Sequence, residues 1–181
     1  MKTRRRIALP ALAVTVLLGA SACADPAPRP AAATPAAFGG TDLAWIEVAI
    51  ALDEQLLPLL ALVPQRAGDP AVKALATTVA GFTGGELTAL RTLHDSAGLP
   101  AKNPHEGMPM PGMVTADRLT TAATLSGAAF DRLAAETIRE SLEQGRNLAE
   151  SEQKHGVEAR TRALAADAAA ARTRTLSSLG D

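Results

Sequence analysis

The side chains best suited to bind a ligand gather in one short stretch of the chain. It contains His105, Met108, Met110 and Met113, which include every methionine after Met1. Thioether sulfur favours soft cations such as Cu(I) or Ag(I), and imidazole adds a borderline nitrogen donor. Neighbouring prolines bend this stretch, so its four side chains could converge on one ion. The alternative is a linker between helices whose methionines pack onto the fold as adaptable apolar side chains.

A second pattern, Glu152-x-x-His155, has the spacing of a carboxylate di-iron ligand pair. A di-iron centre needs a second such pair and two further Glu ligands, and the sequence contains no second Glu-x-x-His. His155 precedes Gly156, where it would complement the dipole at the end of a helix, and His94 has the same explanation. The pattern therefore does not predict iron chemistry.

The sequence also argues against catalysis and nucleic-acid binding. It shows no Ser-His-Asp order, no phosphate-binding glycine loop and no zinc motif. With no Tyr, one Trp and three Phe, it offers no stacking platform for bases. We expect neither an enzyme nor a nucleic-acid partner.

A faint internal duplication relates the two halves of the chain. A shift of 89 positions gives 11 identities over residues 42–90, all in one register. It places Asp42 on Asp131 and Glu54 on Glu143. A carboxylate in the first turn of a helix is stabilising, and inward-facing acids of a bundle could hold a hard cation. Asp131, the second copy of this aspartate, could instead pair with Arg132 or Arg139.

Apolar residues at helical spacing predict four long helices and a short one, at about 42–63, 70–97, 116–125, 126–156 and 157–179. We expect helix caps at Thr41, Asp69, Thr115 and Ser126, and a kink or break at Pro58. Nothing predicts a strand. Two tandem hairpins, at 41–97 and 115–179 with a linker at 98–114, predict an all-α, ferritin-like four-helix bundle over residues 41–181.

The first 22 residues predict an export signal. Basic residues precede an apolar run at 7–20 that is too short to span a membrane as a mature helix. Ala20-Ser21-Ala22-Cys23 then resembles a lipoprotein cleavage site, which predicts a lipidated Cys23. Ordinary signal-peptidase cleavage is the alternative. Residues 3–7 loosely match a twin-arginine signal, so the export route stays open.

The segment at 23–40 is rich in Ala and Pro and is predicted to be a flexible tether. Removal of residues 1–22 takes away four of the 18 basic residues and none of the 19 acidic ones, which leaves a net charge of −5. We therefore expect a protein held at the outer face of the cell membrane through its lipid, with any protein partner unknown.

Several segments together resemble one family. Asp42-x-x-Trp45, Glu54-Gln55, the stretch from Asp69 to Ala76, Glu86-Leu87 and the phrase Met110-Pro-Gly-Met113 are similar to the domain-of-unknown-function family 305 (DUF305). The resemblance implies a secreted or lipid-anchored four-helix protein of the ferritin-like type. It also implies copper, because some members are periplasmic copper binders.

The chain departs from the family at its hallmark pair of histidines. Leu52-Asp53 stands there in the first half, and Ser141-Leu142 in the second, or Glu140-Ser141 if the register slips by one. Thr83 and Arg172 replace a family glutamine. Two expectations result: weak copper binding by the loop at 105–113, or a non-enzymatic scaffold that has lost the family's metal site.

Overall fold

Residues 37–179, the part of the chain that this computed structural model describes, fold into five helices and the segments that connect them. The helices are α1 (Gly40–Arg66), α2 (Pro70–Ala97), α3 (Ala116–Thr124), α4 (Gly127–His155) and α5 (Ala159–Ser178). The described residues contain no strand, so the all-α prediction is confirmed. The predicted signal peptide, Cys23 and most of the tether lie outside the described residues.

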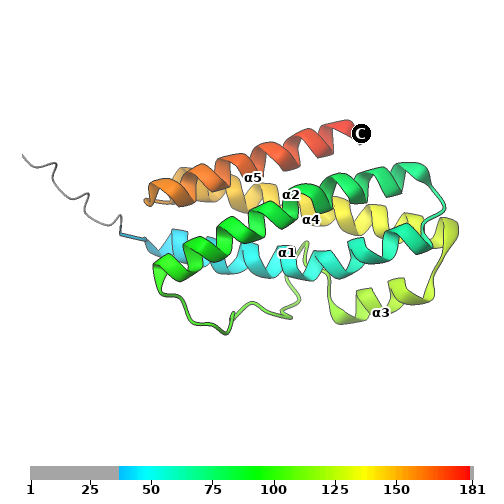
Figure 1. Ribbon diagram of the computed structural model, residues 1–181, viewed down its shortest axis with the longest axis horizontal. Coiled ribbons are helices and arrows are strands. Elements are labelled where there is room, and N and C mark those ends of the chain that lie inside the picture. The colour runs from blue at the N-terminus through cyan, green and yellow to red at the C-terminus, as the bar shows by residue number, and fades with distance from the viewer. Residues whose placement is uncertain (1–36, 180–181) are drawn as a thin grey trace, which may run out of the picture. The chain divides into compact units, whose positions relative to one another are not determined.

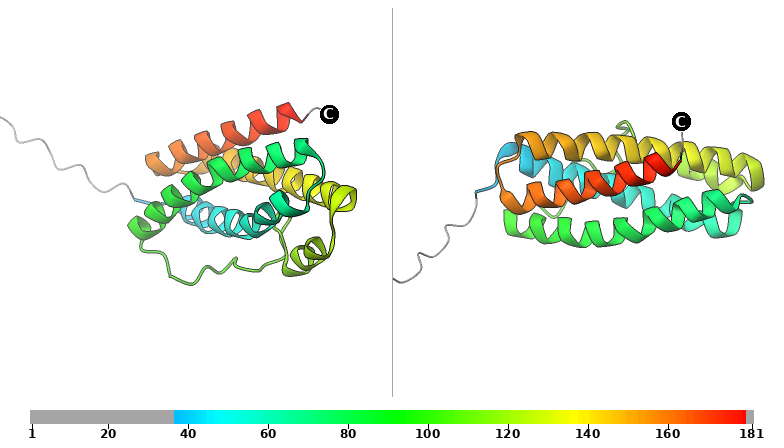
Figure 2. Two further views of the ribbon diagram at one scale, coloured as in Figure 1. Left: turned by 45° about the vertical axis from the view of Figure 1, so that its right-hand side comes forward. Right: turned by 90° about the horizontal axis from the view of Figure 1, so that it is seen from above.

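The long helices form two hairpins, α1 with α2 and α4 with α5, which pack against each other (Figure 1). The start of α1 lies beside the end of α4, because Asp42 accepts a hydrogen bond from the Val157 N–H. Successive long helices therefore run up, down, down and up, and residues 98–126 cross from one hairpin to the other along the bundle (Figure 2). A single long crossover is a ferritin-like arrangement.

The sequence predicts a kink or break at Pro58, but the first helix does not break there. It continues to Arg66 and contains both Pro58 and Pro64. Proline removes one backbone donor, but Leu56, Leu59 and Val63 on either side of these positions are buried in the core. Burial of this apolar face keeps the helix continuous.

The predicted helix caps have mixed outcomes. Asp69 and Thr115 each accept a backbone N–H at the start of their helices, as expected. Thr41 lies inside α1, and the cap position falls to Gly39, whose N–H donates to the Asp42 carboxylate. Ser126 stands at the cap position of α4 without a capping bond from its side chain.

The core of the bundle consists of two large apolar clusters separated by a polar layer, and a third, small cluster joins Val48 and Leu52 to Met113. The first large cluster surrounds Leu59, Val79 and Phe130, and the second surrounds Ile46 and Leu90. On each long helix, one residue of the polar layer lies between the residues of the two clusters: Asp53, Glu86, Gly145 and Arg172. No helix within residues 37–179 is long and apolar enough to cross a membrane.

Candidate functional site

Hydrogen-bonded turns fold the loop at 105–113. The Met108 N–H donates to the His105 carbonyl at 3.2 Å, and the Met113 N–H donates to the Met110 carbonyl at 3.1 Å. The first and last Cα atoms of such turns lie within about 7 Å of each other. The backbone therefore brings His105 close to Met108, and Met110 close to Met113.

The three methionines differ in exposure. Met113 is buried against Val48 and Leu52 of α1, and its sulfur accepts a hydrogen bond from the Gln55 amide at 3.4 Å. Met110 is half-buried against the same cluster. Met108 is 42% exposed. Two thioethers thus lie against the bundle wall and one faces solvent.

Gly112 fits the loop closely against α4. Its φ is +78°, and a Cβ there would lie 2.5 Å from the Gln144 Cβ. Gln55 and Gln144 are equivalent positions of the duplication, so Gly112 and Met113 contact both copies of one repeated residue. This contact fixes the loop across the seam between the two hairpins.

His105 has an incompletely used side chain. Its backbone N–H donates to Asn103, whose amide donates to the Glu47 carbonyl of α1 at 2.7 Å. The ring nitrogen Nδ1 is shielded from solvent and has no hydrogen-bond partner among residues 37–179. A buried polar atom without a partner is rare and points to a water or an ion as its natural partner.

In the polar layer, a buried guanidinium joins two buried carboxylates. Arg172 of α5 donates to Asp53 of α1 at 3.0 Å and to Glu86 of α2 at 2.7 Å. All three side chains are at most 7% exposed. Burial raises the pKa of Asp53 well above its ordinary value, with help from the Glu86 charge. Burial opposes the charge of Arg172, but the charges of Asp53 and Glu86 hold the Arg172 pKa above its ordinary value.

The positions of the family's histidine pairs do not fit a metal ion in this chain. Leu52 and Leu142 have no donor atom, and Asp53 is already paired with Arg172. Ser141 is buried. Within the described residues, no group of three or more His, Cys, Asp or Glu side chains is arranged to hold a metal ion. The thioethers and imidazole of the loop are a different donor set, and their chemistry suits a soft cation.

The duplicated acids lie in two kinds of environment. Asp42 is fully buried and accepts backbone hydrogen bonds from Gly39, Val157 and Glu158. Burial alone would raise its pKa, but the neighbouring Glu152 side chain, followed by these backbone bonds, holds the pKa of Asp42 below its ordinary value. Glu54 and Glu143 are exposed, and the former pairs with Arg91 on the surface. Asp131 accepts from the Gly68 and Asp69 N–H groups.

Glu152 and His155 face different surroundings. Glu152 is fully buried beside Asp42, whereas His155 is exposed at the end of α4. Burial, followed by the Asp42 carboxylate, raises the pKa of Glu152 to about 8. A Cβ at Gly156 would collide with the Glu152 carboxyl group, so glycine makes room for it. His94 lies near the end of α2 and contacts the Pro100 carbonyl.

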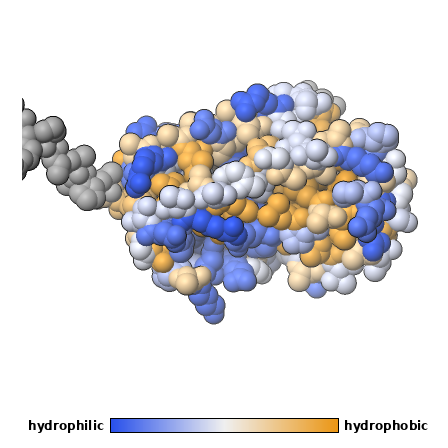
Figure 3. All heavy atoms as spheres, viewed as in Figure 1, coloured by the Kyte–Doolittle hydropathy of each residue, from blue (hydrophilic) through white to orange (hydrophobic). Residues whose placement is uncertain are grey.

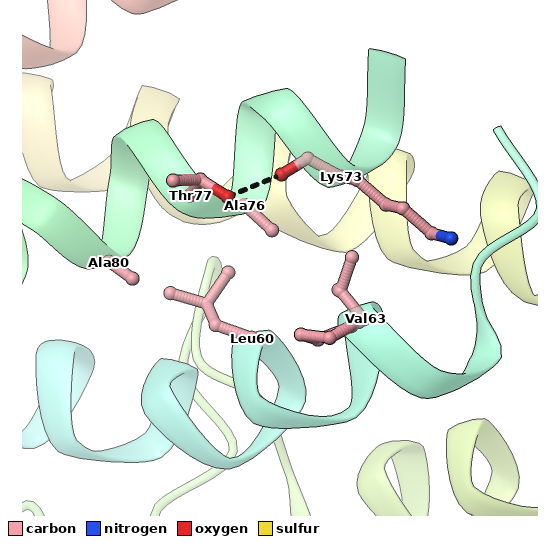
Figure 4. A pocket seen from close by; sticks show the side chains of 7 residues that line it. Leu60, Val63, Lys73, Ala76, Thr77 and Ala80 are labelled. Atoms are coloured by element: carbon pink, nitrogen blue, oxygen red, sulfur yellow. Dashed lines mark hydrogen bonds between the residues drawn. The ribbon is translucent and has the colours of Figure 1, made fainter. Parts of the chain in front are cut away.

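An apolar groove of ≈ 480 Å³ runs between α1 and α2, where orange atoms gather on the face shown in Figure 3. In Figure 4, Leu60 and Val63 of α1 face Ala76 and Ala80 of α2, and the Lys73 amine points away at one end. Thr77 donates its hydroxyl proton to the Lys73 carbonyl. The groove can accept apolar groups but offers no set of acid–base side chains.

Sequence reasoning missed the ion cluster of the polar layer. In the sequence, Asp53 and Arg172 stand out only as replacements for family residues, and Glu86 only as part of a matching phrase. A usable signal was present, because Asp53, Glu86 and Arg172 occupy positions that continue the buried faces of their helices. Charged residues at such positions predict partners in the core.

Comparisons with known proteins give one family and one fold. The family model described as a domain of unknown function (DUF305) matches residues 42–181. A DUF305 protein of Streptomyces coelicolor, a candidate secreted protein, has a similar structure with a TM-score of 0.68 at 19% identity, over 78% of this chain and 90% of that one. A DUF305 fragment from Deinococcus radiodurans gives 0.71 at 13% identity, over 79% and 95%. No curated protein matched the chain.

Proposed function

Since this chain belongs to the DUF305 family, we propose that it is an extracytoplasmic, non-catalytic protein that binds one soft cation, Cu(I), weakly through the loop at 105–113. The sequence of residues 1–23 supports export and lipidation of Cys23. The related Streptomyces coelicolor protein, a candidate secreted protein, supports an extracytoplasmic location. The lipid would hold the domain at the outer face of the cell membrane.

The observation that carries the copper proposal is the unpartnered Nδ1 of His105, among residues 37–179, on a loop that contains three thioethers. The turns bring Met108 near His105 and Met110 near Met113. The sulfur of Met113 is a weak acceptor, and the one hydrogen bond that it accepts within residues 37–179 comes from the Gln55 amide at 3.4 Å. Weak binding is expected because Met113 is buried and Met108 would have to move inward from solvent.

The runner-up is a scaffold or partner-binding bundle without a metal. It is supported by the apolar groove between α1 and α2 and by the packing of Met113 against Leu52, which is an apolar residue at a family histidine position. In this alternative the methionines are packing residues, and a protein partner would contact the groove.

A competitive Cu(I) titration of the soluble protein from Asp25 onward separates the two candidates. The wild type is compared with a variant carrying Met108→Leu, Met110→Leu and Met113→Leu, and circular dichroism verifies the fold of both. One-to-one binding that is lost in the folded variant supports a copper site. The absence of binding by the wild type rejects it and leaves the scaffold.

A further inference from the structure

The polar layer is assembled by all four long helices around one side chain. Arg172 of α5 is bound by Asp53 of α1 and by Glu86 of α2, and it lies against Gly145 of α4. A Cβ at position 145 would collide with Nε of Arg172, so only glycine leaves room for the guanidinium there. The site therefore encloses a cation from every side of the bundle.

Further contacts fit the planar shape of the guanidinium. Its carbon lies 5.7 Å from the centre of the Phe82 ring, within the range of a cation–π contact. Nη1 also donates to the Ala168 carbonyl of its own helix at 3.3 Å. The two carboxylates are bound by different nitrogens, Nη1 and Nη2. A fork of donors on a rigid plane satisfies this arrangement, whereas a point charge would not.

Some buried acceptors of the polar layer receive no hydrogen bond from Arg172. Asp53 Oδ2 and the Thr83 hydroxyl are both buried and have no hydrogen-bond partner within residues 37–179. Two carboxyl groups therefore share one permanent cation, in a layer that excludes solvent. A charged carboxylate in this layer needs the cation, because without a counter-ion burial favours the neutral, protonated form.

The site exists in only one of the two repeats. The positions 89 residues from Asp53, Glu86 and Arg172 are Leu142, Thr175 and Thr83, and none of these is charged. The ion cluster is therefore not part of the duplicated pattern.

We propose that Asp53 and Glu86 form an internal cation site specific for a planar guanidinium, which the Arg172 side chain supplies. The proposal goes beyond copper binding by the loop and does not depend on it. If it is correct, removal of the Arg172 side chain leaves a site that binds free guanidinium in preference to metal ions.

Chemical rescue of Arg172→Ala tests the proposal in the soluble protein from Asp25 onward. Guanidinium is added at about 10 mM, far below the molar range in which it denatures proteins. At ten times its Kd it should raise the Tm of the variant by about 3–5 °C. It should not raise the Tm of the wild type or of Arg174→Ala, an exposed arginine on the same helix.

Urea, Zn²⁺ and Cu²⁺ are each added to Arg172→Ala in place of guanidinium, to test whether the site prefers guanidinium. A second control combines Asp53→Asn and Glu86→Gln with Arg172→Ala, which should abolish the rescue by guanidinium. Stabilisation of Arg172→Ala by a metal ion and not by guanidinium would overturn the proposal. A folded Arg172→Ala that neither guanidinium nor a metal ion stabilises would also overturn it. If Arg172→Ala does not fold alone, refolding from urea is measured instead. Recovery with guanidinium then supports the site, and failure to recover rejects it.

Discussion

Asp42 and Asp131 fasten opposite ends of the bundle in the same way, from equivalent positions of the duplication. Asp42, at the start of α1, accepts the Val157 and Glu158 N–H groups in the turn between α4 and α5. Asp131, at the start of α4, accepts the corresponding N–H groups in the turn between α1 and α2.

The partners of these two carboxylates are themselves related by 89 residues, because Gly68 matches Val157 and Asp69 matches Glu158. Asp69 then caps α2, and Glu158 caps α5. The first helix of each hairpin thus holds the turn of the other hairpin. An insertion or deletion between either aspartate and the turn of its own hairpin would change the spacing that these two sets of hydrogen bonds share. This gives a physical reason why the duplication keeps a constant shift of 89 positions.

Replacement of either aspartate should destabilise the bundle, and Asp42 should matter more because it is fully buried. Hydrogen bonds to charged groups contribute about 1.5–3 kcal/mol each. We expect Asp42→Ala to lower the free energy of unfolding by about 3 kcal/mol, and Asp131→Ala by about 1–2 kcal/mol. Urea denaturation measures both. Asp117→Ala, in the exposed first turn of α3, is the control. An equal loss of stability there would contradict the role given to the hydrogen bonds of Asp42 and Asp131.

The sequence predicted the fold more completely than the site. Helical periodicity and the Asp69-Pro70 signal gave the bounds of α2 correctly, since both act locally. The continuation of α1 past Pro58 could not be read locally, because it depends on burial against other helices. The meeting of Asp53 with Arg172 also depends on packing, since these residues are 119 positions apart.

The loop shows a different limit of sequence reasoning. The clustering of Met108, Met110 and Met113 was visible, but their different exposures were not. Those exposures arise from contacts of the loop with Leu52 and Gln144 on two separate helices. Composition alone cannot indicate which thioether faces the bundle.

The stability of the protein should fall as pH rises from about 4.5 to 8 because of Glu152. Its pKa is about 8 in the fold and 4.5 ordinarily, so the folded protein keeps a proton that the unfolded chain releases. The stabilising contribution is present below pH 4.5 and is lost as pH rises through 8.

Asp53, whose pKa is also raised, acts in the same direction, so single variants are needed to separate the two groups. Glu152→Gln should be more stable than wild type at pH 8.5, and the difference should shrink towards pH 4.5. Thermal unfolding across this range measures the effect, with the exposed Glu150→Gln as control. A constant difference between variant and wild type at every pH would exclude titration of Glu152 as the cause.

Two glycine-to-alanine substitutions should have opposite signs. Gly145→Ala would force the enclosed Arg172 side chain to shift, at a cost of about 1–3 kcal/mol. Gly81→Ala, on an exposed part of α2 with open space around it, should stabilise by about 0.5–1 kcal/mol. Chemical denaturation of both variants gives the comparison. Stabilisation by Gly145→Ala would show that the guanidinium is not tightly enclosed.

Removal of Arg172 alone from the buried ion cluster should lower the free energy of unfolding far more than neutralisation of all three of its charged side chains. Arg172→Met leaves two buried carboxyl groups without their cation, at a cost of about 3–5 kcal/mol. Arg172→Met combined with Asp53→Asn and Glu86→Gln should restore most of that loss in urea denaturation. Arg91→Ala, which breaks the exposed pair with Glu54, should cost less than about 1 kcal/mol. A triple variant less stable than Arg172→Met would contradict this account.

The most direct test of the central claim, that the soft cation binds in the loop and not in the core, is a titration followed by NMR of methionine methyl groups. Only Met108, Met110 and Met113 follow Met1, and single leucine substitutions assign each signal. Ag(I), a redox-stable substitute for Cu(I), should shift the methyl signals and the His105 ring signal together, saturating at one ion per chain. Methyl signals that stay unchanged while the fold remains intact would contradict a loop site and leave the scaffold as the function.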